Sequence, residues 1–228
     1  VGCEFAQFHN FSFLKRREKI GSIGSWQELA PGEEKVFEFV ITWFFPNRVK
    51  AWIEFDEDYE KFQRGEYGTV RNYYAIKFKD AWDVGQYVYR NKERLEKESR
   101  NFSEAMFRRT TLPYYVIDAL TANITNLRSN LCFRLEDGTF GGFEGIRDYI
   151  GCGYGSVPHV WNYAQTAAFL FPDLEETMRN VEFLRETDEN GCMSTRMFSV
   201  FDQERYAMVP ACDGELGSIV RIYRDFKN

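Results

Sequence analysis

The sequence contains few residues that could hold a metal or a set of disulfides. It has five cysteines and two histidines in 228 residues, and no cysteines form a Cys-x-x-Cys pair. An odd number of cysteines without such a pair predicts neither a complete disulfide framework nor a zinc knuckle. Since only His9 and His159 are available as further ligands, we expect no metal site.

The sequence also lacks a long apolar run and an excess of positive charge. Its longest apolar stretch, Phe37 to Phe45, is far shorter than the roughly 20 residues that a membrane-spanning helix needs. Lys and Arg number 29 against 35 Asp and Glu, which gives a net charge of −6. This balance argues against binding to a phosphate backbone as the main task. We therefore expect no membrane span and no nucleic-acid partner.

Aromatic residues, in contrast, are abundant, and in the first third of the chain they follow a period of two. From Glu34 to Phe45 large residues occupy every second position, which predicts a strand with a heavy core face. Its large residues are Phe37, Phe39, Ile41, Trp43 and Phe45. The pair Pro31-Gly32 is a turn signal in front of this strand. With shorter strands expected at 4–8, 51–55 and 73–78, residues 1–78 resemble the end of a β-sandwich.

From Asp80 onward the pattern is helical. Asp80 is the expected N-cap of a helix that runs to about Arg100, and a second helix is predicted from about Pro113 to Ser129. After a glycine-rich stretch, Pro158 starts a further helix that Pro172 kinks or breaks. The last predicted helix carries an apolar stripe formed by Ile219, Val220, Tyr223 and Phe226. The predicted fold class is therefore α+β.

Glu144 is the strongest candidate for chemistry. It is flanked by Gly141, Gly142 and Gly145, so the backbone around it can approach a ligand closely. The plainer interpretation is a loop glutamate in water.

Three further polar residues are candidates for binding. His159 and Asn162 lie three positions apart and share one face at the start of a predicted helix. Asp213 precedes the last helix, where N-capping is its default role and binding of a hydroxyl group is the alternative. Trp161 lies in an apolar stripe, so we expect it in the core.

Several long, ordered stretches carry a resemblance to a known family. They are Leu135–Gly145, His159–Glu175, Ala211–Gly214 and Ile222–Arg224, and Phe78–Val84 matches the link between two domains. In these stretches the chain resembles glycoside hydrolase family 116, the non-lysosomal glucosylceramidases or bile acid β-glucosidases and their bacterial relatives.

The resemblance implies a retaining β-glycosidase that hydrolyses β-glucosides and needs no cofactor. Its fold is an N-terminal β-sandwich packed on an (α/α)6 barrel, and its substrates are small β-glycosides, oligosaccharides or glycolipids. The family's nucleophile is a glutamate in a glycine-flanked loop, and Glu144 matches its position. His159 and Asp213, with Asn162 beside them, become candidate ligands for sugar hydroxyls.

One expected part of the site has no counterpart in the sequence. The family's acid/base is an aspartate in an Asp-Gln-Thr-Tyr-Asp-like segment, and no such segment occurs here. We therefore expect a segment of a longer protein, with the sandwich end at 1–78, the linker helices and first barrel helices at 79–228, and the rest of its own catalytic domain as partner. Such a chain should be nearly inactive by itself.

Two other classes of function stay open. The first is a non-catalytic carbohydrate-binding or structural module, which would present an exposed aromatic platform around Trp43 and Trp52. The second is an inverting glycosidase of the same helical architecture, with its two carboxyl groups roughly 6.5–9.5 Å apart.

Overall fold

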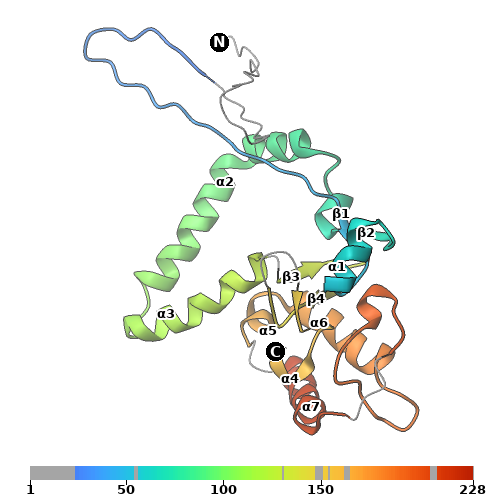
Figure 1. Cartoon of the computed structure of the whole chain (residues 1–228). Coiled ribbons are helices and arrows are strands. Elements are labelled where there is room, and N and C mark those ends of the chain that lie inside the picture. Colours follow the sequence, from blue (N-terminus) through green and yellow to red (C-terminus); the bar gives the residue numbers. More distant parts are fainter. Residues whose placement is uncertain are drawn as a thin grey trace. The chain divides into compact units, whose positions relative to one another are not determined.

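The computed structural model describes residues 24–53, 56–129, 131–146, 151–153, 155–161, 165–205 and 210–227 (Figure 1). The chain divides into two compact units, Val1–Ile41 and Thr42–Asn228, and all the helices and strands named below lie in the second unit. The strand expected at 4–8 and the candidate residue Asn162 lie outside the described residues.

The second unit mixes helices with short antiparallel strand pairs, which confirms the α+β class. The α-helices are α1 (Asp56–Gln63), α2 (Ala81–Phe107), α3 (Tyr114–Ala122), α4 (Pro158–Trp161), α5 (Thr166–Leu170), α6 (Pro172–Asn180) and α7 (Cys212–Lys227). Shorter helical turns are η1 (Tyr73–Ile76), η2 (Asn123–Arg128), the π-helix η3 (Val181–Arg185) and η4 (Ser199–Phe201). The paired strands are β1 (Asn47–Val49) with β2 (Thr69–Arg71), β3 (Cys132–Arg134) with β4 (Phe140–Gly142), and β5 (Gly145–Ile146) with β6 (Gly151–Cys152).

The helix boundaries follow local signals in the sequence. Asp80 is the N-cap of α2, and its carboxylate accepts a hydrogen bond of 2.7 Å from the backbone N–H of Asp83. Such a cap satisfies one of the amide groups that a helix leaves unpaired at its start. Pro172 is the first residue of α6 and separates it from α5, because Phe171 between them is not helical. Both predictions are confirmed.

The predicted strand from Glu34 to Phe45 is wrong. The structure places no helix or strand at residues 33–46, and the large side chains expected in a core are exposed, for example Ile41 at 82% and Phe45 at 68%. Among the described residues, another segment pairs only with the end of this stretch, where the backbone N–H of Asn72 donates to the carbonyl of Pro46 at 2.8 Å. A strand needs such partners for its backbone groups along its whole length. The turn at Pro31-Gly32 does form, with Gly32 at a φ of +79°.

The strand expected at 73–78 is also wrong, because η1 occupies this place. Tyr74 explains the choice: its hydroxyl accepts from the backbone N–H of Phe45 at 2.7 Å and donates to the carbonyl of the same residue at 2.6 Å. The side chain of Asn72 donates to that carbonyl as well, at 2.9 Å. The side chains of Tyr74 and Asn72 thus form the hydrogen bonds with the N–H and carbonyl of Phe45 that a neighbouring strand would otherwise form.

The core of the second unit lies between the β3–β4 hairpin and the segments around η3 and η4. Its main cluster is formed by Trp52, Phe133, Leu135, Phe143, Val181, Met193, Met197, Val200 and Phe201. A smaller cluster joins the hairpin to α4 and α6 through Cys132, Phe140, Trp161 and Met178. Trp161 is 8% exposed and packs edge-on against Phe140, so its predicted place in the core is confirmed.

Candidate functional site

The loop that carries Glu144 follows directly from strand β4. The side chain of Ser156 holds its start, because Ser156 Oγ accepts from the N–H of Gly142 at 2.9 Å and lies 3.1 Å from the carbonyl of that residue, to which it donates. Both groups are buried. The backbone in front of Glu144 is therefore fixed by a residue from a different segment of the chain.

The glycines before Glu144 allow close packing within the protein. A side chain at Gly142 would place its Cβ 2.6 Å from the ring of Trp161, and one at Gly141 would lie 3.0 Å from the ring of Phe133. The sequence indicated a close approach of the backbone here, and in the structure it approaches these core aromatics.

The carboxylate of Glu144 is partly exposed and lies beside a positive charge. Its Oε2 is 3.9 Å from Nη1 of Arg196, and the exposed fractions of the Arg196 and Glu144 side chains are 23% and 32%. Gly153, at a φ of +70°, lies against the same carboxylate, where any Cβ would overlap it. Arg196 was not found from the sequence, since nothing in the local pattern connects it with Glu144.

Helix α4 carries the predicted residue His159, and its last residue, Trp161, reaches the start of this loop. Trp161 at its end covers Gly142, and the backbone of His159 packs on α7, where a Cβ at Gly214 would lie 3.6 Å from its nitrogen. His159 is half-buried, and its Nδ1 is buried without a hydrogen-bond partner among the described residues. A buried nitrogen without a partner is uncommon in proteins.

Asp213 lies next to that contact but does not occupy the predicted N-cap position. Helix α7 begins at Cys212, so Asp213 is inside the first turn, where a negative charge is favourable. Its Oδ1 accepts from the N–H of Gly214 at 3.0 Å, and the residue is exposed. The structure thus brings Asp213 close to His159 through the packing of α4 on α7.

The aromatic platform expected of a binding module is not formed by the two tryptophans. Trp52 is 5% exposed and its ring packs on Phe133, Phe143 and Phe201 at centroid distances of 5.6, 5.0 and 4.7 Å. Trp43 is 66% exposed. Trp52 is therefore a core residue, and only Trp43 presents its ring to solvent.

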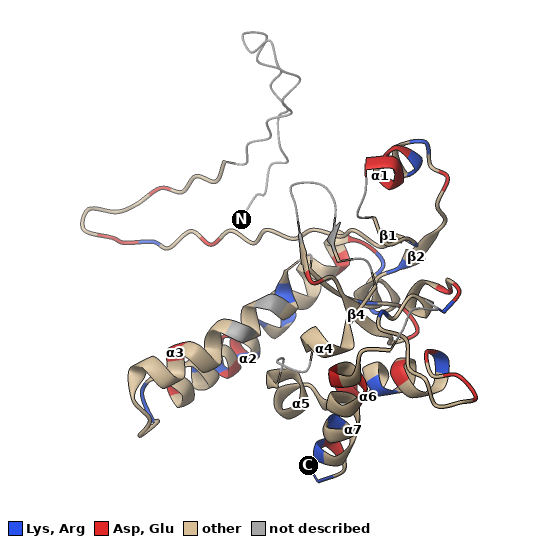
Figure 2. Ribbon diagram, turned by 60° about the horizontal axis from the view of Figure 1, so that its bottom comes forward, with Lys and Arg blue, Asp and Glu red and all other residues tan. Residues whose placement is uncertain are grey.

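A group of buried charges joins α6 and η3 to α7. In Figure 2 the helices α6 and α7 lie side by side, and both carry acidic and basic residues. Glu182 is its centre: Arg221 Nη2 donates to Glu182 Oε1 at 2.8 Å, and Arg179 Nη2 donates to the same oxygen at 3.0 Å. All three residues are less than 8% exposed. At one end of the group Arg224 pairs with Glu175 at 3.0 Å.

Burial dominates the titration of this group. It raises the pKa of Glu182 above its ordinary value although two arginines pair with it, and it lowers the pKa of Arg221 to about 10. Both directions disfavour the charged forms, so desolvation outweighs pairing for both partners. The ion group is therefore better evidence for a fixed arrangement of α6 and α7 than for stability.

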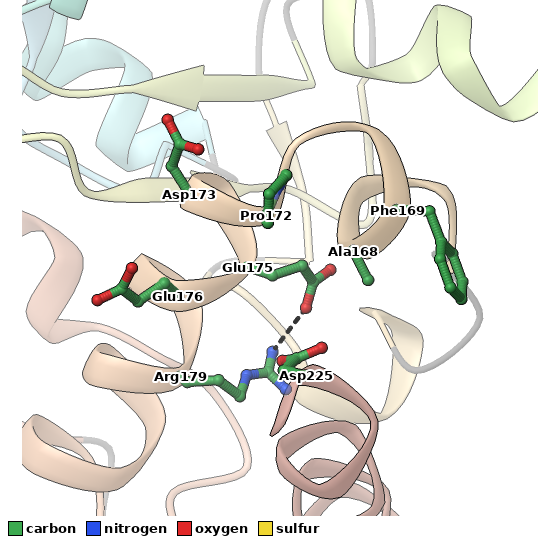
Figure 3. A pocket seen from close by; sticks show the side chains of 8 residues that line it. All are labelled: Ala168, Phe169, Pro172, Asp173, Glu175, Glu176, Arg179 and Asp225. Atoms are coloured by element: carbon green, nitrogen blue, oxygen red, sulfur yellow. Dashed lines mark ion pairs between the residues drawn. The ribbon is translucent and has the colours of Figure 1, made fainter. Parts of the chain in front are cut away.

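Beside this group is a cavity of about 760 Å³ (Figure 3). Helix α5 contributes Ala168 and Phe169, α6 contributes Glu175 and Arg179, and α7 contributes Asp225. Figure 3 shows Glu175, Arg179 and Asp225 converging at one place, with Ala168 above them. Sequence reasoning missed this cavity, because its polar residues come from two helices far apart in the chain.

The described residues offer no cluster of three or more His, Cys, Asp or Glu side chains that could hold a metal ion. In the same part of the chain, none of the helices is both long enough and apolar enough to cross a membrane.

Comparison of the sequence with protein-family models gives no match, and comparison with curated proteins gives none either. The similarity to glycoside hydrolase family 116 therefore depends on the sequence motifs alone.

Proposed function

We propose that the chain is part of a retaining β-glycosidase and that Glu144 is its nucleophile. The observation that supports this is the position of the Glu144 carboxylate, which is accessible, lies on a loop held by Ser156, and has Arg196 at 3.9 Å. The resemblance of Leu135–Gly145 to the family's nucleophile loop points to the same residue.

The chemistry needs a carboxylate in this kind of place. In a retaining mechanism the carboxylate attacks the anomeric carbon and forms a glycosyl ester, while a second carboxyl group about 5–5.5 Å away protonates the leaving oxygen. The positive charge of Arg196 stabilises the negative charge of Glu144 before the attack. His159, Asp213 and Asn162 are proposed to bind hydroxyls of a β-glucoside, whether a small glycoside, an oligosaccharide or a glycolipid.

The proposed fold of the whole enzyme explains why one half of the catalytic pair is missing. In it, residues 1–78 are the end of a β-sandwich and residues 79–228 contain the first helices of an (α/α)6 barrel. The acid/base would then come from the rest of the catalytic domain. Steady turnover of a natural glucoside by the 228-residue chain alone would contradict this division.

A mechanism-based reagent tests the nucleophile without the missing acid. A 2-deoxy-2-fluoro-β-glucoside with a dinitrophenolate leaving group needs no protonation, and its glycosyl ester hydrolyses slowly. We expect intact-mass measurement of the longer parent protein to show one adduct, which peptide mapping places on Glu144. The Glu144→Gln variant should show none, because an amide does not attack. Glu136→Gln, a matched change of an exposed residue in the turn of the β3–β4 hairpin, should keep the adduct.

Two results would favour the other functions. A parent protein that hydrolyses β-glucosides without forming an adduct would have another nucleophile or an inverting mechanism, and proton NMR of the first anomer released would separate these. A folded parent with neither adduct nor hydrolysis would favour a binding module, for which the exposed ring of Trp43 is then the residue to change.

A further inference from the structure

The cavity between α5, α6 and α7 has the size of a small-molecule site. Its volume of about 760 Å³ lies in the range of roughly 300–1,000 Å³ that is typical of ligand pockets. Ala168, Phe169 and Pro172 form an apolar wall, and Phe169 is 64% exposed. Its ring face is thus open to a ligand.

Arg179 supplies donors that have no partner. The residue is 7% exposed, and only Nη2 of its guanidinium is engaged, with Glu182 at 3.0 Å and Glu175 at 3.6 Å. Its Nε and Nη1 are buried and have no hydrogen-bond partner within the described part of the chain. Since an unpaired buried donor is costly, this arrangement is explained if a ligand accepts from it.

Asp225 supplies the complementary acceptor on the facing helix. Its Oδ1 accepts from Nε and Nη2 of Arg224 at 2.9 and 2.8 Å. Its Oδ2 is buried and has no hydrogen-bond partner among the residues described. Arg179 on α6 and Asp225 on α7 both line the cavity, and Figure 3 shows them among its lining side chains.

The charges around the cavity select the class of ligand. Asp173, Glu175, Glu176 and Asp225 line it together with a single arginine. Arg224 pairs with Glu175 and Asp225, but the carboxylates still outnumber the arginines, so an anion is disfavoured. A cation such as an ammonium group would pair with the carboxylates, but it has only hydrogen-bond donors and could not accept from Arg179. A neutral hydroxyl group satisfies both, because it accepts from the guanidinium and donates to the carboxylate.

We propose that this cavity binds the ring of a neutral sugar, with hydroxyls held by Arg179 and Asp225 and an apolar ring face on Phe169. The C–H bonds of a pyranose face carry slight positive charge and fit the negative face of an aromatic ring.

This site is separate from the Glu144 loop, with which it shares no lining residue. Asp213, the candidate sugar ligand on α7, is twelve positions before Asp225, which corresponds to about 18 Å along the helix. The inference does not depend on the glycosidase proposal, because it concerns binding without reaction.

Titration of the isotope-labelled 228-residue chain with methyl β-D-glucopyranoside, followed by amide NMR, tests the proposal. We expect shifts at Ala168, Phe169 and Asp225. Phe169→Ala removes an exposed ring and should weaken binding roughly three- to tenfold. Asp225→Asn, which replaces the free acceptor with a donor, should weaken it about tenfold. Asp118→Asn, the same change at an exposed position on α3, should leave the affinity unchanged.

Specific outcomes would overturn the proposal. If the glucoside leaves these amide signals unchanged but inorganic phosphate shifts them, the cavity binds an anion. If putrescine shifts them instead, the cavity binds a cation. Unchanged affinity in folded Phe169→Ala and Asp225→Asn variants would reject the cavity as the sugar site. If Glu144→Gln loses glucoside binding while both cavity variants keep it, all binding occurs at the proposed catalytic loop. That result would reject the cavity site and leave the glycosidase proposal intact. If Asp225→Asn does not fold, Phe169→Ala decides.

Discussion

Gly153 determines where the carboxylate of Glu144 can lie. Its φ of +70° is in the left-handed region, which other residues adopt only with strain. A Cβ at this position would also overlap the Glu144 carboxylate, so glycine is required for two independent reasons. The position of the proposed nucleophile thus depends on a residue with no side chain and no chemistry of its own.

The variant Gly153→Ala separates these two reasons when it is compared with Gly191→Ala. Gly191 has a φ of +82° and open space around it, so alanine there adds backbone strain alone. We expect Gly191→Ala to lower the free energy of unfolding by about 1–2 kcal/mol and to leave labelling of Glu144 unchanged. Gly153→Ala should cost more and should also slow labelling, because the carboxylate must move away from Arg196. Urea unfolding and the rate of adduct formation measure the two effects, and equal behaviour of both variants would contradict this account.

At the scale of elements, the sequence predicts best those helix boundaries that depend on residues close together in the chain. The N-cap at Asp80 and the break at Pro172 depend on residues a few positions apart, and both are confirmed. The alternation from Glu34 to Phe45 shows only that one face is apolar, and it cannot supply the partner that would make the segment a strand.

The same distinction applies to the candidate sites. The glycine flanks indicated Glu144 from local sequence, whereas Arg196 reaches it only through the fold. In the buried ion group, Glu175 and Arg179 have helical i, i+4 spacing, but their connection to Arg221 on α7 has no sequence signal.

The ion group between α6 and α7 gives the chain a defined pH dependence. Burial raises the pKa of Glu182 above the ordinary value of 4.5, so the folded state binds this proton more tightly than the unfolded state. The resulting stabilisation is complete below about pH 4.5 and is lost as the pH rises through the raised pKa.

The Glu182→Gln variant removes this titration and serves as the reference. We expect the free energy of unfolding of the wild type, relative to the variant, to decrease between about pH 4 and pH 7, as measured by urea unfolding. The trend should persist at high ionic strength, which screens exposed charges but not this buried pair. An increase over the same range would mean that Arg179 and Arg221 outweigh burial.

At the scale of the whole molecule, exposed aromatic side chains occur on two kinds of backbone. Phe37 and Trp43 lie in a stretch without helix or strand, whereas Tyr89 is on helix α2 and is 82% exposed. A protease needs an extended backbone, so a helix must first unwind, and exposure of the side chain is not sufficient.

Limited proteolysis with chymotrypsin distinguishes these cases. Within the described part of the chain we expect the first cuts at residues 24–46, the later ones in α2 after Tyr89, and none at the buried Phe133 and Phe201 while the fold persists. Mass spectrometry of the products over time gives the order. A first cut at Tyr89 would show that α2 unwinds more easily than its regular hydrogen bonds suggest.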